Sequence, residues 1–136
     1  MKTKIELKYK SDKEFTGINE NGNEVKVDMR APEEKEGQSP MEMLLSALAA
    51  CAGVEIVSMI KKRRKEFVDL QAVMEGDRRE EHPKAYTKIH LKYIITSPDL
   101  TEEEATRIVD LATTKYCSVA GSVGAEQTHS FEIKRP

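Results

Sequence analysis

The sequence predicts an α+β domain in which several β-strands surround one long, buried helix. The first observation is a run of apolar or small residues from Met41 to Ile60, which follows a set of helix-start signals. The second is the alternation of apolar and charged residues in both halves of the chain, which has the period of a β-strand. The chain has 136 residues, so we expect a single domain over residues 1–136.

Strand patterns dominate the part of the chain before the apolar run. Residues 5–9 alternate apolar with charged side chains, which predicts a half-buried strand. A second strand is expected around Glu14–Ile18, and Asn21-Gly22 then favours a hairpin turn. Residues 24–29 alternate again and predict a third strand. Residues 30–38 are polar and interrupted by Pro and Gly, so they are expected to form the loop that leads to the helix.

The central helix is predicted to begin at Pro40. Ser39 suits the N-cap and Glu42 follows three positions later, which is the pattern of a capping box. Residues 41–60 are apolar or small on every side, and such a helix is expected to be buried on every side. Its length of about 30 Å would also cross a bilayer. However, Glu42 and Glu55 disfavour a membrane span, because carboxylates are costly in hydrocarbon.

The chain after the central helix is predicted to hold three more strands and two more helices. A basic segment, Lys61–Lys65, suits the C-terminus of the central helix. A second capping box, Thr101-x-x-Glu104, is expected to open a helix that runs to Tyr116. The remaining predicted elements are a strand over 68–74, a charged turn over 78–83, a strand over 87–95, a short helical turn within 118–125 and a strand at 131–133. The predicted order is therefore β-β-β-α-β-β-α-α-β.

A helix that is apolar all round creates a packing problem for a chain of this size. One sheet face covers only one side of the helix, so the other side needs a second cover. Symmetric pairing of two copies, in which the sheets enclose both central helices, is the simplest solution. The sequence therefore predicts a homodimer.

Composition excludes several classes of function. The net charge is -2 and the pI is about 6.0, so no basic field is available for nucleic acid. The chain has no Trp and three Phe, which argues against stacking platforms for single strands. The first residues lack a signal core, so the cytoplasm is the expected compartment. His82, His90 and His129 are scattered, and no metal site is expected.

The two cysteines admit two interpretations. Cys51 lies in the middle of the apolar helix, and Cys117 follows the second helix. Both can be small buried hydrophobes, a common use of free cysteine. Alternatively, one is a peroxidatic thiolate and the other a resolving thiol that closes a disulfide, which an external dithiol then reduces. Residue spacing alone does not decide between these interpretations.

A family resemblance favours the second interpretation. The segments Ser39–Cys51 and Tyr116–Ala120, with the predicted element order, resemble the family of osmotically induced and organic hydroperoxide resistance proteins, the OsmC/Ohr superfamily. Further similarity to its YhfA-like branch lies in Arg78–Glu81 and Thr128–Ser130. The resemblance implies an OsmC-like fold, with antiparallel sheets wrapped around central helices in an intertwined homodimer. It also implies Cys51 as the peroxidatic residue and Cys117 as the resolving one.

The sequence departs from the family pattern around the expected activating groups. Characterised peroxidases of the family carry Glu directly after the helix-opening Pro, where this chain has Met41, and its carboxylate comes one residue later at Glu42. Glu42 is nine positions before Cys51 and so faces away from it on a regular helix, which favours a capping role over a catalytic one. The resemblance gives Arg30 as a possible match for the activating arginine. Ser118 replaces a Pro after the second cysteine.

Arg78 and Arg79 are alternative cations, or members of a solvated turn. We therefore expect an enzyme that reduces organic hydroperoxides through Cys51, with Cys117 as resolver and no bound cofactor or metal. Its partners would be a second copy, a small hydroperoxide and a dithiol reductant, but neither nucleic acid nor a membrane. The alternative is a non-enzymatic binding protein or redox sensor with an apolar pocket at the dimer interface.

Overall fold

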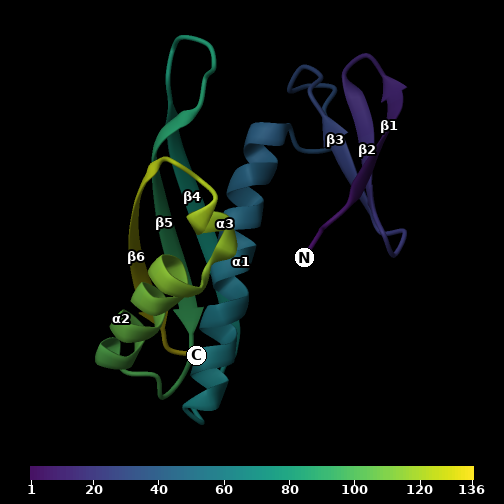
Figure 1. Cartoon of the computed structure of the whole chain (residues 1–136). Coiled ribbons are helices and arrows are strands. Elements are labelled where there is room, and N and C mark those ends of the chain that lie inside the picture. The colour runs from purple at the N-terminus through teal and green to yellow at the C-terminus, as the bar shows by residue number, and fades with distance from the viewer. The chain divides into compact units, whose positions relative to one another are not determined.

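The computed structural model describes residues 1–136 and has the predicted α+β order with one added element (Figure 1). The added element is a π-helical turn, η1, directly after the second helix. The elements are β1 (Ile5–Ser11), β2 (Glu14–Asn19), β3 (Glu24–Asp28), α1 (Pro40–Lys62), β4 (Asp69–Arg78), β5 (Tyr86–Thr96), α2 (Glu102–Leu111), η1 (Ala112–Tyr116), α3 (Ser118–Gly121) and β6 (Glu126–Lys134).

The chain forms two compact units, Met1–Leu44 and Leu45–Pro136, each of which is described by itself. The first unit contains the antiparallel sheet β1-β2-β3. The predicted Asn21-Gly22 turn joins β2 to β3, and the amide of Gly22 donates a 3.0 Å hydrogen bond to the carbonyl of Asn19. Gly22 has a φ of 87°, which is the left-handed conformation that such a turn favours.

The sheet of the first unit leaves its apolar side chains open. We expected a half-buried β1, but Ile5, Leu7 and Tyr9 are 61%, 61% and 66% exposed. That prediction is wrong for the single chain. The physical reason is that the buried side chains of this unit are the polar Glu14 and Asp28, so the three strands have no apolar core of their own.

The second unit contains the sheet β4-β5-β6, which is mixed rather than antiparallel. Strands β4 and β5 are antiparallel, as expected, whereas β5 and β6 are parallel. The difference arises because α2, η1 and α3 connect β5 to β6 and return the chain to the end of the sheet where β5 began. Parallel neighbours need a crossover connection of this kind.

The core of the second unit lies between one face of this sheet and the helices. Alternate side chains of β5 point inward, and both α1 and α2 pack on them (Figure 1). The fully buried apolar side chains of these three elements are Leu48, Ala52, Ile56, Ile60, Ile89, Leu91, Tyr93, Ile95, Ala105, Ile108 and Val109. The core therefore fixes the position of α1 relative to the sheet.

In a single chain α1 is buried along one stripe only. Its buried residues are Leu48, Ala52, Gly53, Ile56 and Ile60, whereas Val54 is 69% exposed. The prediction of burial on every side is thus not met within one copy. By length and composition α1 could also cross a bilayer, a test that core helices of soluble proteins pass as well.

Candidate functional site

The second unit brings its two cysteines together. Cys51 is half-buried on α1, and Cys117 is buried between η1 and α3; both are free thiols. The Cys117 side chain is hydrogen-bonded to the sulfur of Cys51. Two residues far apart in the sequence therefore form one thiol pair, which sequence spacing alone could not establish.

The π-helical turn η1 delivers Cys117 to this position. We expected a regular helix through Tyr116, but α2 ends at Leu111 and widens into η1. Two hydroxyl groups bond back to the preceding turn: Thr113 Oγ1 donates to the carbonyl of Val109 at 2.8 Å, and Thr114 Oγ1 donates to that of Asp110 at 2.6 Å. Such back-bonding competes with the regular helical pattern, and π-turns are frequent next to functional residues.

Backbone amides stabilise the thiolate form of Cys51. Hydrogen bonds from the amide of Val119, the thiol of Cys117 and the amide of Ser118 lower the pKa of Cys51, with the Val119 amide the largest contributor. Burial and the negative charge of Glu55 oppose this shift. The net effect favours a thiolate at Cys51, and the thiolate is the nucleophilic form of cysteine.

Cys117 has the opposite tendency. Burial raises the pKa of Cys117, and the neighbouring Cys51 sulfur raises it further. Its Sγ accepts a 3.3 Å hydrogen bond from the Ala120 amide and lies 3.9 Å from the carbonyl oxygen of Leu48. The pair is therefore polarised, with Cys51 favoured as thiolate and Cys117 as neutral thiol.

Tyr93 forms part of the surroundings of the thiol pair. This β5 residue is fully buried, and its hydroxyl donates a 2.9 Å hydrogen bond to the carbonyl of Ala49 on α1. Burial raises the pKa of Tyr93, and the charges of Cys117 and Cys51 raise it further, so its hydroxyl stays neutral. Sequence reasoning gave Tyr93 only as an inward strand residue, and no local motif marked it as a neighbour of the cysteines.

Comparison with known proteins identifies the family. Residues 32–132 match the family model described as OsmC-like protein. The chain belongs to the OsmC-like protein family. It is 36% identical over 121 residues to Protein YhfA of Escherichia coli strain K12, covering 88% of this chain and 89% of that protein.

Solved structures agree with this OsmC-like assignment. A hypothetical protein from Aquifex aeolicus VF5 matches with a TM-score of 0.87 and 32% identity, over 100% of this chain and 98% of the other. The organic hydroperoxide resistance protein OhrB of Bacillus subtilis matches with a TM-score of 0.63 and 17% identity, over 98% of both chains. The predicted OsmC-like fold is thus confirmed.

Arg30, the cation that the family resemblance suggested, lies in the first unit and is held by carboxylates. Its Nη2 atom lies 2.8 Å from Asp28 Oδ2 and 3.1 Å from Glu14 Oε1, and its Nε donates to Asp28 Oδ1 at 3.1 Å. The hydrogen bond with Arg30 holds the pKa of Asp28 well below its usual range. Arg30 as the activator of Cys51 remains a prediction.

Glu42 has the geometry of a capping residue in this OsmC-like chain. The amide and the hydroxyl of Ser39 each donate to Glu42 Oε1 at 2.9 Å, and the Glu42 amide donates to Ser39 Oγ at 3.4 Å. Hydrogen bonding to Lys35, followed by the bonds from Ser39, lowers the pKa of Glu42 to about 2. These contacts account for its carboxylate without a catalytic role.

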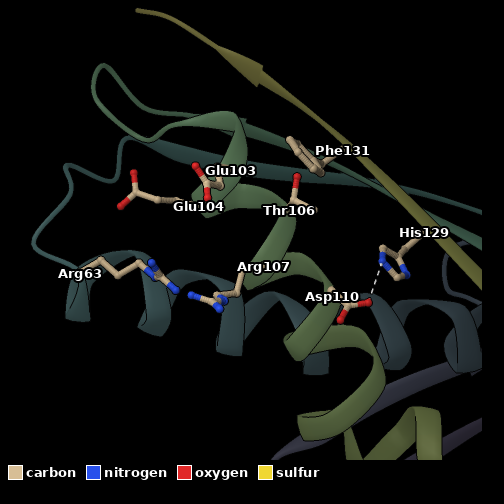
Figure 2. A pocket seen from close by; sticks show the side chains of 8 residues that line it. All are labelled: Arg63, Glu103, Glu104, Thr106, Arg107, Asp110, His129 and Phe131. Atoms are coloured by element: carbon tan, nitrogen blue, oxygen red, sulfur yellow. Dashed lines mark ion pairs between the residues drawn. The ribbon is translucent and has the colours of Figure 1, made fainter.

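The other candidate residues have local structural contacts. Arg78 Nε donates to the carbonyl of Lys84 at 2.7 Å and closes the turn after β4. His129 Nε2 lies 3.6 Å from Asp110 Oδ1 in a surface hollow of about 710 Å³, into which Arg63 and Arg107 also project (Figure 2). Neither cysteine lines that hollow. No three His, Cys, Asp or Glu side chains in the chain are grouped to hold a metal ion.

An apolar groove lies along the open side of α1. It has a volume of about 690 Å³, and the residues that line it come from α1, from β4 and its approach, and from β5: Ser46, Ala49, Ala50, Gly53, Val54, Val57, Phe67, Asp69, Leu70, Gln71, Ala72 and Tyr93. Tyr93 is the residue that this groove shares with the surroundings of the thiols.

Proposed function

We propose that this protein reduces organic hydroperoxides with Cys51 as the attacking thiolate and Cys117 as the resolving thiol. The observation that carries the proposal is the polarised pair, in which backbone amides favour the thiolate of Cys51 while burial keeps Cys117 protonated. A reactive thiolate beside a resolving thiol is the arrangement that reversible cysteine oxidation requires.

The chemistry uses only groups of this chain and two small molecules. The Cys51 thiolate attacks the terminal peroxide oxygen, the O–O bond breaks, and the alkoxide takes a proton to leave as an alcohol. Cys51 is then a sulfenic acid. The Cys117 sulfur attacks the Cys51 sulfur, water leaves and a disulfide forms. An external dithiol reduces this disulfide by exchange and is itself oxidised. No bound cofactor or metal takes part in these steps.

Relatives support the stress-related, peroxide-directed part of the proposal. OhrB of Bacillus subtilis is named an organic hydroperoxide resistance protein and shares the fold. The contacts of Cys51 and Cys117 support the cysteine assignments independently of that name. We place the reaction in the cytoplasm, where thiols are kept reduced and a dithiol reductant is available.

We propose a homodimer as the working form. Two apolar surfaces support it: the exposed side of α1 around Val54, and the exposed β1 side chains Ile5, Leu7 and Tyr9. A second copy would remove both surfaces from water, which favours association. Sedimentation across a dilution series tests it, and a folded monomer at all concentrations would contradict it.

Consumption of cumene hydroperoxide in the presence of dithiothreitol tests the reaction. We expect turnover by the unaltered protein and none above background for Cys51→Ser. The Cys117→Ser variant should form a sulfenic acid at Cys51 in the first turnover, which dimedone labelling and mass spectrometry detect. The matched control, Ser118→Ala, alters a neighbour while keeping both sulfurs and the backbone amide. Equal turnover by the unaltered protein and Cys51→Ser would reject the proposal.

A second candidate function is apolar ligand binding with redox-sensing or incidental cysteines. The observation that favours it is the 690 Å³ groove, which lies against α1 and does not include either sulfur among its lining residues. Native mass spectrometry of the purified protein would detect a retained ligand. A retained apolar ligand together with thiols that survive mild peroxide would favour this function over the first.

A further inference from the structure

One ionisable side chain near the thiol pair has no part in the proposed reaction. Glu55 lies four residues after Cys51 on α1, so the two side chains are neighbours on one face of the helix, with Cβ atoms about 5–6 Å apart. Glu55 is half-buried. Its negative charge raises the pKa of Cys51.

Three titratable groups of the second unit interact electrostatically with Cys51. They are Glu55 on the same helix, Tyr93 on β5, and Cys117 before α3. The stabilising contributions come from neutral donors, the amides of Val119 and Ser118 and the thiol of Cys117. None of these contributions to the pKa of Cys51 comes from a Lys, Arg or His, and Glu55 is the one carboxylate among them.

We propose that Glu55 determines substrate charge at this site, so that Cys51 reacts with neutral hydroperoxides in preference to anionic ones. The inference rests on Cys51 being the reactive thiol of the proposed function. A carboxylate one helical turn from the nucleophile repels an anionic reactant during the attack and leaves a neutral one unaffected. Tert-butyl and cumene hydroperoxides are neutral reactants of this kind, whereas a peroxide with an ionised acid group next to the O–O bond is not.

Glu55 also has a consequence for the nucleophile itself. By opposing the amide donors it keeps the pKa of Cys51 from falling further. A thiolate of higher pKa is intrinsically more nucleophilic. The same carboxylate therefore selects against anions and preserves the reactivity of the sulfur toward neutral substrates.

Alkylation of the reduced protein by two reagents of matched size tests this charge selection without relying on peroxide turnover. The Cys51 thiolate displaces iodide from neutral iodoacetamide or from anionic iodoacetate, and peptide mass spectrometry separates labelling at Cys51 from labelling at Cys117. We expect Glu55→Gln to lower the ratio of the iodoacetamide rate to the iodoacetate rate at Cys51 by about three- to tenfold. Glu102→Gln, an exposed carboxylate at the start of α2, is the control and should leave the ratio unchanged.

Each outcome has one meaning. A lower ratio in Glu55→Gln alone supports the charge selection. An unchanged ratio, the same fall in Glu102→Gln, or failure of either reagent to reach Cys51 overturns it. A lower ratio in a protein that consumes no hydroperoxide would leave the charge selection in place and reject the proposed peroxidase activity. Circular dichroism confirms that each variant is folded.

Discussion

The two units of this chain differ in the kind of side chain that they bury. Residues 45–136 bury an apolar core between one sheet and two helices, and they hold both cysteines. Residues 1–44 bury two carboxylates, leave the apolar side chains of β1 exposed, and hold Arg30 in an ion-pair cluster. The unit with the two cysteines thus has the apolar core, and the unit with the candidate cation Arg30 lacks one.

This difference bears on how the thiol is activated. In the second unit the pKa of Cys51 is lowered by neutral donors, chiefly the Val119 amide. In the first unit the positive charge of Arg30 is compensated by Asp28 and Glu14. The amide donors to Cys51 all belong to the second unit, whereas burial of the β1 side chains needs a surface that the first unit does not itself provide.

The largest expected effect concerns the core of the second unit. Ile56→Ala should lower the free energy of unfolding by about 3 kcal/mol, because Ile56 is fully buried on α1 and its truncation leaves a cavity. Urea unfolding followed by circular dichroism measures the change. Lys62→Ala, at the exposed end of the same helix, is the control, with a change within about 0.5 kcal/mol. Equal costs for both variants would contradict the assignment of Ile56 to the core.

The next effect tests whether the open sheet of the first unit is covered in solution. We expect Leu7→Ala to cost about 1–2 kcal/mol, because a homodimer would bury this side chain, which is 61% exposed in one copy. The thermal midpoint should also rise with protein concentration. Lys8→Ala, on the other face of the same strand, is the control. A cost near zero for Leu7→Ala, with a midpoint independent of concentration, would contradict the dimer.

The parts of the fold that could be predicted are those determined by local sequence signals. The order of strands and helices followed from residue alternation, the Asn21-Gly22 turn and two capping boxes, which are all local signals. The parallel pairing of β5 with β6 was missed because it depends on where the crossover ends, which no local pattern encodes. The π-turn was missed because Thr113 and Thr114 fit a regular helix by propensity and reveal their back-bonding only in three dimensions.

Prediction of the site had a similar limit. The resemblance gave Cys51 and Cys117, and the structure shows them in contact. Sequence reasoning used Glu55 only to argue against a membrane span, although its spacing of four residues from Cys51 placed both on one helix face. The sequence did not indicate that Tyr93 or the amides of residues 118–119 lie near the cysteines. A buried tyrosine or a backbone N–H has no sequence pattern that reveals which group it contacts.

A smaller effect is expected from the hydrogen bond between the two cysteines. Cys117→Ala removes the hydrogen-bond donor to Cys51, so the pKa of Cys51 should rise and its thiolate fraction at pH 7 should fall. We expect the rate of Cys51 alkylation at pH 7 to drop by about three- to tenfold, since one pKa unit corresponds to a factor of ten. Above both pKa values the rates should converge. Cys117→Ser keeps a donor and is the control, and equal pH profiles for Cys117→Ala and the unaltered protein would argue against the hydrogen bond.

The smallest expected effect on reactivity is that of Arg30→Gln. Asp28 and Glu14 compensate the guanidinium charge, so the rate of Cys51 alkylation at pH 7 should change by less than about twofold. Stability should change instead. The Arg30 hydrogen bond lowers the pKa of Asp28, so this contribution to stability is fully present above the unfolded pKa of about 4 and is lost as the pH falls through the lower folded value.

The difference in urea midpoint between Arg30→Gln and the unaltered protein should accordingly be large at pH 7 and shrink as the pH falls below about 4. Lys26→Gln, a surface cation near the same cluster, is the control for a general change in charge. A drop of tenfold or more in Cys51 reactivity for Arg30→Gln alone would assign Arg30 as the activating cation, because a charge fully compensated by carboxylates cannot shift a thiol pKa by a full unit. Amide donors would then be only part of the activation.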